Sequence, residues 1–459
     1  MRTTPPRGDL LSQLRTAFPD LHLITDLDIL ESYRRDQAQF VDAGMPLTVA
    51  FPRSASEVQE LVRFAAADKL PIVPRGAGSG LSGGANAIDG CLVICLDRMN
   101  QILDIDASNL TAVVQPGVLN ADLKREVASH GLYYPPDPAS SEFSTIGGNI
   151  ATNAGGLCCL KYGVTGDFVL GLEVIQGDGT SLRTGRRTRK GVAGYDLTRL
   201  FVGSEGTLGI VTEATLRLRP APLPASTLIA TFPTLDGAGR AISAIVSKLV
   251  PSMLELLDRH TLQAIEEWRP LGVGTAAEAL LIARSDDSDS EEQLAVIENL
   301  CVDSGADLVA RSTTAEEAEM LLEARRLAFP SLERKGNVML DDVAVPPSRI
   351  ASLLREISEI ADRNSVLIGT FGHAGDGNLH PTIVFDGLDP SSLNAARTAF
   401  DEIVKAALDL GGTITGEHGV GLLKRQYLRA ELGDTSMRLH AALKEVLDPA
   451  GILNPGKGF

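Results

Sequence analysis

The chain has 459 residues, 44% of them hydrophobic, which is enough for two or three domains with large buried cores. Its 42 basic and 59 acidic residues give a net charge of −17, which argues against nucleic acid or an anionic membrane surface as the main partner. No run of about 20 apolar residues could span a membrane, and residues 1–20 lack a signal-peptide pattern, so we expect a cytoplasmic protein. The five cysteines form no CxxC pair, so an iron–sulfur cluster is not expected.

The first 40 residues are expected to form a peripheral, amphipathic helical segment around DLLSQLRTAF. A strand–helix–strand pattern follows in LTVAF, SASEVQELVRFAAADK and LPIVPRG, where Ser54 is expected to cap the helix. CLVICL, TAVVQPG, residues 169–183 and residues 208–218 predict further strands, and NADLKREVASHG predicts a second helix.

The proline-rich stretch RPAPLPAS (219–226) predicts a linker. Beyond it, helical patterns alternate with strand patterns. The helical ones are DGAGRAISAIVSKL, SEEQLAVIENLC and AEEAEMLLEARRLAF, and the strands are EALLIAR, NSVLIGTF and PTIVFD. This alternation predicts a second, α+β domain with an antiparallel sheet. The tail, MRLHAALKEVLDPAGILNPGKGF, predicts a helix followed by a proline-glycine loop.

The segment PRGAGSGLSGG (74–84) contains a formal GxGxxG match at Gly78, Gly80 and Gly83. A Rossmann dinucleotide motif must pass from a strand directly into a helix. Here the following GANAIDGCLVICL predicts a turn and another strand, so a Rossmann site is not expected. What remains is either a surface loop or a loop whose backbone N–H groups bind an anion.

Two further segments are rich in small residues: PDPASSEFSTIGGNIATNAGG (136–156) and LFVGSEGTLGIVTEATLRL (200–218). The first is either disordered or wrapped around an extended ligand, and its Ile146 and Ile150 favour order. The three segments could therefore converge on one long ligand that contains a pyrophosphate.

Two glycine-rich stretches carry metal-ligating residue types. FGHAGDGNLHP (371–381) contains His373 and His380, and GGTITGEHGVG (411–421) contains Glu417 and His418. On one continuous strand, residues seven apart face opposite sides, although the glycines could let the chain curl back. Two imidazoles and a carboxylate could bind a metal, but spacing alone leaves hydrogen-bonded turn residues as the alternative.

Taken together with KYGVTGDFVLGLEVI, the three small-residue segments resemble the FAD-binding domain of the vanillyl-alcohol oxidase/p-cresol methylhydroxylase superfamily. FGHAGDGNLHP, GGTITGEHGVG and LDPAGILNPGKGF resemble the FAD-linked 2-hydroxy-acid dehydrogenases, which include D-lactate dehydrogenases, glycolate oxidase catalytic subunits and D-2-hydroxyglutarate dehydrogenases. The resemblance implies an α+β fold with a two-part FAD-binding domain and an α+β substrate domain. The expected divisions are a helical segment at 1–40, the FAD-binding domain at 41–222, a substrate domain with the metal site at 223–430, and a segment at 431–459 that returns to the FAD domain.

The same resemblance implies the site residues. His373, His380 and Glu417 would bind a divalent metal, for which zinc fits and manganese, iron or cobalt would also fit. The FAD would be non-covalent, because the first loop has no histidine and neither loop has a cysteine at the equivalent stretch. The expected FAD contacts are Pro74, Arg75, Gly76, Ala77, Gly78, Ser79, Gly80, Leu81, Ser82, Pro138, Thr145, Gly148, Asn149, Thr152, Asn153, Gly155, Glu205, Gly206, Ile210 and Asn454.

These residues imply oxidation of a 2-hydroxy acid to the 2-keto acid. The metal would lower the pKa of the substrate hydroxyl, His418 would accept its proton, and C2 would deliver hydride to flavin N5. Arg325, in EARRLAFP, would bind the substrate carboxylate, although two arginines on a helix are more often solvated.

D-2-hydroxyglutarate dehydrogenases carry a lysine where this chain has Met339 and Leu340, so a small monocarboxylate of the D-lactate or glycolate class is expected. Alternatives are a D-2-hydroxyglutarate-type enzyme, an alkylglycerone-phosphate synthase type, a flavin-binding accessory subunit of a larger oxidase and a flavin-free metallohydrolase. Electrons would leave to a separate protein, a quinone or oxygen, and the chain could act as a homodimer or within a hetero-oligomer.

Overall fold

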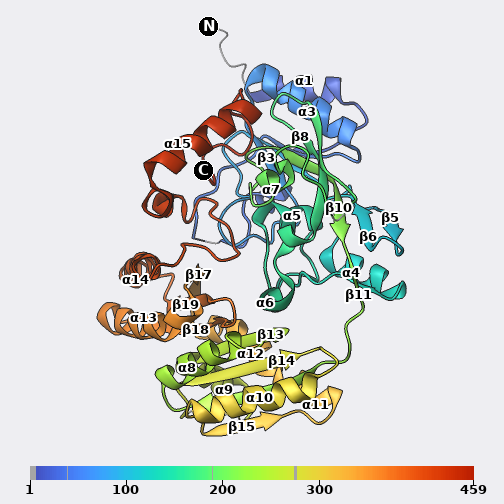
Figure 1. Ribbon diagram of the computed structural model, residues 1–459. Coiled ribbons are helices and arrows are strands. Elements are labelled where there is room, and N and C mark those ends of the chain that lie inside the picture. The colour runs from blue at the N-terminus through green and yellow to red at the C-terminus, as the bar shows by residue number, and fades with distance from the viewer. Residues whose placement is uncertain (1–6, 39, 189, 273–275) are drawn as a thin grey trace. The chain divides into compact units, whose positions relative to one another are not determined.

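The computed structural model describes residues 7–38, 40–188, 190–272 and 276–459 (Figure 1). The chain forms two compact units. Unit 1 comprises Met1–Gly155, Val164–Ala221 and Glu417–Phe459, and unit 2 comprises Gly156–Gly163 and Pro222–Gly416. This division differs from the expected one at three places. Residues 7–38 are part of unit 1 rather than a separate segment. Gly156–Gly163, which starts at the last residue of the second small-residue segment, belongs to unit 2, and unit 1 resumes at Glu417 rather than at residue 431.

The first sheet of unit 1 has the strand order β1-β2-β4-β3. Its strands are β1 (His22–Ile24), β2 (Thr48–Phe51), β4 (Leu92–Cys95) and β3 (Ile72–Arg75). The last three are mutually parallel and β1 is antiparallel to β2. Helix α3 (Ala55–Asp68) buries its apolar stripe in the core beside this sheet, and Ser54 caps it as expected, accepting a 3.2 Å bond from the Glu57 N–H. In the described residues no helix lies between β3 and β4, whereas a Rossmann motif would need one directly after β3.

The N-terminal segment is not wholly helical, which corrects the expectation for residues 1–40. It contains α1 (Arg7–Ala17) and α2 (Leu27–Glu31), but β1 lies between them and pairs with β2 at the sheet edge. Residues 1–6 lie outside the described residues.

The second sheet of unit 1 is antiparallel, with the order β5-β6-β10-β8-β9. Helix α5 (Ile146–Thr152) lies inside the second small-residue segment, for which no helix was expected. Thr145 caps this helix by accepting a 3.2 Å bond from the Gly148 N–H. The remaining elements of unit 1 are β5 (Ile102–Asp106), β6 (Thr111–Val114), β7 (Leu132–Tyr133), β8 (Val169–Ile175), β9 (Ser181–Gly185), β10 (Ile210–Arg217), β11 (Arg219–Pro220), α4 (Asn120–Ser129), α5 (Ile146–Thr152), α7 (Leu197–Phe201) and α15 (Leu428–Leu447).

Unit 2 is built on one antiparallel sheet with the order β15-β12-β14-β13-β18-β19-β16, and β17 also pairs with β19. The predicted α+β domain with an antiparallel sheet is thus confirmed. Its strands are β12 (Ser226–Phe232), β13 (Met253–Asp258), β14 (Ala279–Ser285), β15 (Leu308–Arg311), β16 (Asn337–Leu340), β17 (Val343–Ala344), β18 (Leu367–His373) and β19 (Asn378–Phe385). Its helices are α6 (Cys159–Tyr162), α8 (Leu235–Val246), α9 (Arg259–Trp268), α10 (Ser290–Asp303), α11 (Ala315–Leu321), α12 (Glu323–Glu333), α13 (Ile350–Asn364) and α14 (Pro390–Asp409).

One face of this sheet carries both apolar and ionisable side chains. Because side chains alternate along a strand, Glu255 shares a face of β13 with its neighbours at 253 and 257, and His373 shares a face of β18 with Phe371. Met253, Leu257 and Phe371 pack in one core cluster with apolar residues of α9 and α12. Helices α9 and α12 therefore cover the face on which Glu255 and His373 lie. Among the described residues, no helix is long and apolar enough to cross a membrane.

Candidate functional site

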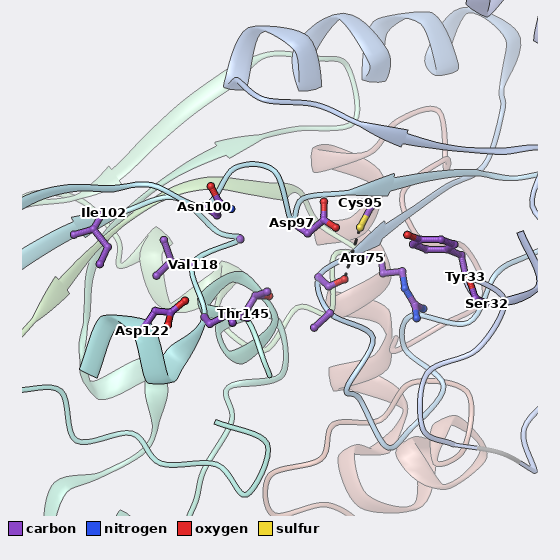
Figure 2. A pocket seen from close by; sticks show the side chains of 14 residues that line it. Ser32, Tyr33, Arg75, Cys95, Asp97, Asn100, Ile102, Val118, Asp122 and Thr145 are labelled. Carbon is purple, nitrogen blue, oxygen red and sulfur yellow. Dashed lines mark hydrogen bonds between the residues drawn. The ribbon is translucent and has the colours of Figure 1, made fainter. Parts of the chain in front are cut away.

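The first two small-residue segments meet at a pocket of about 540 Å³ in unit 1 (Figure 2). Arg75, Gly76 and Ala77 come from the first segment and Thr145 comes from the second. The other lining residues are Ser32, Tyr33, Cys95, Asp97, Asn100, Ile102, Gly117, Val118, Leu119 and Asp122, none of which the sequence analysis had singled out. Asp97 and Asn100 follow the buried strand β4, so their position after an apolar run was the available signal.

The third segment and the C-terminal tail also meet within unit 1. The Asn454 amide donates to the carbonyl oxygens of Gly84 (2.9 Å) and Glu205 (2.8 Å). The Glu205 N–H donates to the Ala151 carbonyl at 2.8 Å, at the end of α5. Three stretches far apart in sequence are thereby tied to the loop after β3.

Several expected cofactor residues have backbone conformations that side chains rarely adopt. Asn153, Glu205 and Asn454 have φ values of 53°, 50° and 43°, a left-handed region that costs about 1 kcal/mol or more for a residue other than glycine. Gly78 has φ 72°, and a Cβ there would lie 2.0 Å from an Arg75 guanidinium nitrogen. Such strain collects at ligand sites, where the surrounding fold must hold the unfavourable geometry in place.

The remaining expected residues are placed as follows. The Arg75 guanidinium donates to the backbone carbonyls of Arg35 (3.0 Å) and Ala85 (3.4 Å), so it shapes the loop itself. The Asn149 side chain accepts a 3.0 Å bond from the Asn120 amide and donates a 3.2 Å bond to the Ser144 hydroxyl. Helix α5 also carries Gly148 and Thr152, β10 begins at Ile210, and the loops carry Gly76, Ala77, Ser79, Gly80, Leu81, Ser82, Pro138, Gly155 and Gly206.

Unit 1 buries two opposite charges beside these loops. Burial raises the pKa of Glu205 to about 7, even though its carboxylate accepts 2.8 Å bonds from the N–H groups of Val420 and Gly421. Burial lowers the pKa of Lys457 to about 8, and its ammonium donates to the carbonyls of Gly84 and Asn86. Nearby, the buried Asn454 Oδ1 has no hydrogen-bond partner among the described residues. A ligand with a donor group would satisfy that oxygen, so the segments fit a polar cofactor.

In unit 2, His373 and His380 lie on adjacent strands of a hairpin rather than in one loop. The register pairs His373 with Asn378 and His380 with Phe371, so the two histidines are diagonal neighbours across β18 and β19. Both are buried, and their Nε2 atoms are 3.4 Å apart. The curl that the glycines permitted is therefore a four-residue hairpin turn over residues 374–377, in which the Gly377 N–H donates to the His373 carbonyl at 3.0 Å.

Each imidazole has a buried carboxylate at its other nitrogen. Glu255 Oε1 lies 2.7 Å from His373 Nδ1, and Asp342 Oδ1 lies 3.6 Å from His380 Nδ1. The Glu255 carboxylate only accepts hydrogen bonds, so it favours a proton on His373 Nδ1 and leaves a lone pair on His373 Nε2. Asp342 lies beyond hydrogen-bond distance of His380 Nδ1 but is the nearest carboxylate to it. The His373 lone pair faces His380 Nε2, where it can accept a proton or bind a cation. Two nitrogen ligands on one tetrahedral metal would be roughly 3.3–3.4 Å apart for bonds of about 2.0–2.1 Å, so the pair fits a metal.

Arg325 points inward and its neighbour Arg326 points outward. Arg325 Nε donates to Glu255 Oε2 at 2.5 Å, its guanidinium carbon lies 4.8 Å from the centre of the Phe371 ring, and its side chain is 13% exposed. Arg326 is 59% exposed and pairs with Glu319 on the surface. Burial raises the pKa of Glu255, but the charges and hydrogen bonds of His373 and Arg325 outweigh burial and hold that pKa at about 2.

Glu417 and His418 are assigned to unit 1, so chain continuity is what relates them to the imidazole pair. Asp342 accepts bonds from the Thr415 hydroxyl (2.6 Å) and the Gly416 N–H (2.9 Å), and the next residue is Glu417. Within unit 1, a Cβ on Gly155 would lie 2.3 Å from a Glu417 carboxylate oxygen. His418 Nε2 lies 3.8 Å from Glu417 Oε1. Glu417 is thus in contact with the second small-residue segment.

Glu255 and Asp342 were not among the residues predicted from the sequence. Both are fully buried acids, and Glu255 interrupts the otherwise apolar strand MLELL. A buried carboxylate almost always has a charged or hydrogen-bonding partner, so an acid at a core position was a usable signal.

Comparisons with known proteins identify the family. The FAD binding domain family matches residues 46–185, and the family of the C-terminal domain of FAD linked oxidases matches residues 222–458. The chain is 48% identical to glycolate oxidase subunit GlcD of Bacillus subtilis (strain 168) over 91% of this chain and 89% of that protein. It is 35% identical to a D-lactate dehydrogenase of Anaerostipes hadrus, over 98% and 97% of the two chains, and 35% identical to a D-2-hydroxyglutarate dehydrogenase of Stutzerimonas stutzeri (strain A1501), over 98% of each.

A solved structure shares the fold at low identity. The 4-ethylphenol oxidase from Gulosibacter chungangensis aligns with a TM-score of 0.80 and 20% identity, over 98% of this chain and 96% of that one. That likeness confirms the predicted fold, and the family models and relatives confirm the predicted membership among FAD-linked oxidases. The chain is therefore an oxidoreductase of the FAD-linked oxidase family, with an FAD-binding domain followed by that family's C-terminal domain.

Proposed function

We propose that this chain oxidises a small 2-hydroxy acid of the D-lactate or glycolate class to the 2-keto acid, with FAD and a divalent metal as cofactors. Relatives named glycolate oxidase subunit and D-lactate dehydrogenase support the reaction class. The observation that carries the proposal lies in unit 2, where a buried carboxylate, Glu255, joins a histidine of the paired imidazoles to an inward arginine. An anionic substrate with a hydroxyl beside its carboxylate matches that combination of groups.

Arg325 would bind the substrate carboxylate. Its Nε is occupied by Glu255, and its two terminal nitrogens have no bond to any described residue. Those nitrogens retain the donors needed for a bidentate, charge-assisted pair. The ring of Phe371 beneath the guanidinium holds its plane, so the direction of the donors is fixed before the substrate arrives.

His373, His380 and Glu417 would hold the metal. Glu417 directly follows Gly416, whose N–H donates to Asp342, and Asp342 is the carboxylate nearest to His380 Nδ1, at 3.6 Å. A bound divalent metal supplies Lewis acidity at a hydroxyl oxygen, which lowers the pKa of the hydroxyl toward neutrality. His418, adjacent to Glu417, would accept the hydroxyl proton.

The FAD would lie along the loop after β3, helix α5 and the Glu205–Asn454 junction, all of which belong to unit 1. Bound FAD supplies the hydride acceptor at its N5 atom. No histidine occurs in the first loop, so we expect FAD to be released on denaturation. The electron acceptor would be a separate protein, a quinone or oxygen.

A D-2-hydroxyglutarate-type enzyme is the second candidate, because that relative is as similar to this chain as the D-lactate dehydrogenase is. A second substrate carboxylate needs a cation, and Met339 and Leu340 supply none. The monocarboxylate is therefore the preferred substrate.

The test is a panel of D- and L-2-hydroxy acids, including glycolate, D-lactate and D-2-hydroxyglutarate, mixed with the purified protein without oxygen. We expect glycolate or D-lactate to bleach the flavin absorbance fastest. Faster bleaching by D-2-hydroxyglutarate would replace the preferred substrate with the second candidate. No bleaching by any member of the panel in the metal-loaded protein would refute the proposed reaction.

A further inference from the structure

The buried Glu255 has no assigned role in the chemistry, although it contacts two of the groups that the proposed function uses. It is fully buried in the middle of β13, on the sheet face covered by α9 and α12. Its two carboxylate oxygens bind different partners: Oε1 lies 2.7 Å from His373 Nδ1, and Oε2 lies 2.5 Å from Arg325 Nε.

We infer that Glu255 is a positioning residue that couples metal binding to substrate binding, by orienting the metal ligand His373 and the carboxylate-binding Arg325 at once. This inference rests on the proposed function for the identity of the substrate, but its metal half can be measured without any substrate. Glu255 itself would touch neither the metal nor the substrate.

The chemistry of both partners requires a carboxylate at this position. His373 can donate through Nδ1 only if that nitrogen carries the proton, which leaves Nε2 as the ligand atom. A carboxylate that accepts from a ligating imidazole fixes the tautomer and the ring orientation, and loss of such a partner typically costs about 10–100-fold in metal affinity. The other oxygen fixes Arg325 through Nε, and so leaves the terminal nitrogens for a substrate.

A glutamine cannot replace Glu255 in both contacts. Its side chain has one acceptor oxygen, and its amide nitrogen only donates. With the oxygen toward Arg325, the amide would face the Nδ1–H of His373; with the oxygen toward His373, it would face the Nε–H of Arg325. Glu255→Gln therefore retains the shape of the side chain, but it either breaks one of the two bonds or moves the proton of His373 from Nδ1 to Nε2, the atom that would bind the metal.

The experiment compares the wild type with Glu255→Gln, Glu255→Asp and Glu319→Gln. Glu319 is the matched control, because it is an acid that pairs on the surface with Arg326, the residue next to Arg325. Metal-stripped holoprotein is titrated with Zn²⁺ and Co²⁺, and kcat and KM for the best hydroxy acid are then measured at saturating Zn²⁺. For Glu255→Gln we expect metal affinity to fall about 10–100-fold relative to the wild type. We also expect its KM for the hydroxy acid to exceed the wild-type KM about tenfold or more, even when metal saturates the site. Glu255→Asp should lie between, because it keeps two acceptor oxygens on a shorter stem, and Glu319→Gln should match the wild type.

Glu255→Gln that binds both metals as the wild type does, with an unchanged KM, would overturn the inference while leaving the proposed function intact. Conversely, a wild type that binds Zn²⁺ but whose flavin no hydroxy acid reduces would refute the proposed function, and the metal titrations would still decide the role of Glu255. A wild type that takes up no metal would overturn the inference.

A measurement on the wild type keeps the inference testable if the Glu255 variants do not fold. The seven histidines are labelled with ¹⁵N, and His373 is assigned from the spectrum of His373→Gln. We expect Nδ1 of His373 to carry the proton in metal-free protein. A His373 with the proton on Nε2 alone would refute the orienting role.

Discussion

Arg325 and Arg326 are adjacent on α12, and replacing each in turn tests which one binds the substrate. Arg325→Ala removes a mostly buried guanidinium that bonds Glu255 and stacks on Phe371, whereas Arg326→Ala removes a 59% exposed one. The helical turn between neighbouring positions gives the two side chains opposite surroundings. The pair is therefore a matched comparison within one helix.

The expected magnitudes follow from these surroundings. Arg325→Ala deletes a charge-assisted pair with the substrate carboxylate worth about 1.5–3 kcal/mol, which corresponds to a rise in KM of roughly 10–150-fold. Arg325→Lys should recover only part of this, because an ammonium cannot reproduce the planar fork or its stacking on Phe371. Arg326→Ala should change KM little, because its exposed side chain pairs with Glu319 and contacts neither Glu255 nor Phe371 in the described residues. Loss of that exposed pair should lower stability by at most about 1 kcal/mol.

The assay is anaerobic flavin reduction at several hydroxy-acid concentrations, which separates the limiting rate from the half-saturating concentration. Thermal unfolding of each variant is measured alongside, because Arg325→Ala also leaves Glu255 with one ionic partner fewer. A large rise in the half-saturating concentration for Arg326→Ala with a silent Arg325→Ala would refute the reasoning.

Three further predictions concern the cofactors and the pH dependence. Chelation, His373→Ala or His380→Ala should abolish reduction of the flavin by substrate while the protein stays yellow, and added Zn²⁺ should rescue only the chelated wild type. Full flavin reduction in protein shown by elemental analysis to be metal-free would contradict this. Gly148→Leu should weaken FAD retention on gel filtration, because a Cβ added there would lie 3.2 Å from Thr145 Oγ1 and meet no other described residue outside its own helix within 4 Å, so the bulk would enter the space proposed for the cofactor. The folded chain holds a proton on Glu205 between pH of about 4.5 and 7, so stability should fall by roughly 3 kcal/mol as the pH rises through that window, and Glu205→Gln should flatten that part of the Tm profile.

The elements that could be predicted are those whose own pattern decides their structure. Helix α3 has an apolar stripe at Val58, Leu61, Val62 and Ala65 and a serine cap, so periodicity and capping agree. Helix α5 was missed because its sequence, IGGNIAT, is poor in helix formers. It forms because Thr145 caps it and its two isoleucines are fully buried, which is a tertiary effect that the local sequence does not encode.

The candidate site shows the same limit. The glycines between His373 and His380 were visible, and Gly377 is required because its φ is 87° and a Cβ would lie 1.9 Å from the Val345 carbonyl oxygen. The register that brings the two imidazoles together was not visible, because it depends on the pairing of whole strands. Glu255 is still harder to foresee, since its partners lie 70 and 118 residues away.

The ionisable groups of unit 2 tolerate burial because they form one connected series of side chains in which both carboxylates accept hydrogen bonds. Arg325 bonds Glu255, Glu255 bonds His373, His373 faces His380, and His380 faces Asp342. Each carboxylate therefore has a cationic or proton-donating neighbour, which offsets the cost of removing it from water. Substitutions inside this series and at its end should have different effects. Loss of an inner partner such as Arg325 leaves a buried charge uncompensated, which should lower the free energy of unfolding by about 3–5 kcal/mol. Asp342, at the end, also anchors the N–H of Gly416 next to Glu417, so Asp342→Asn should disturb metal affinity more than folding.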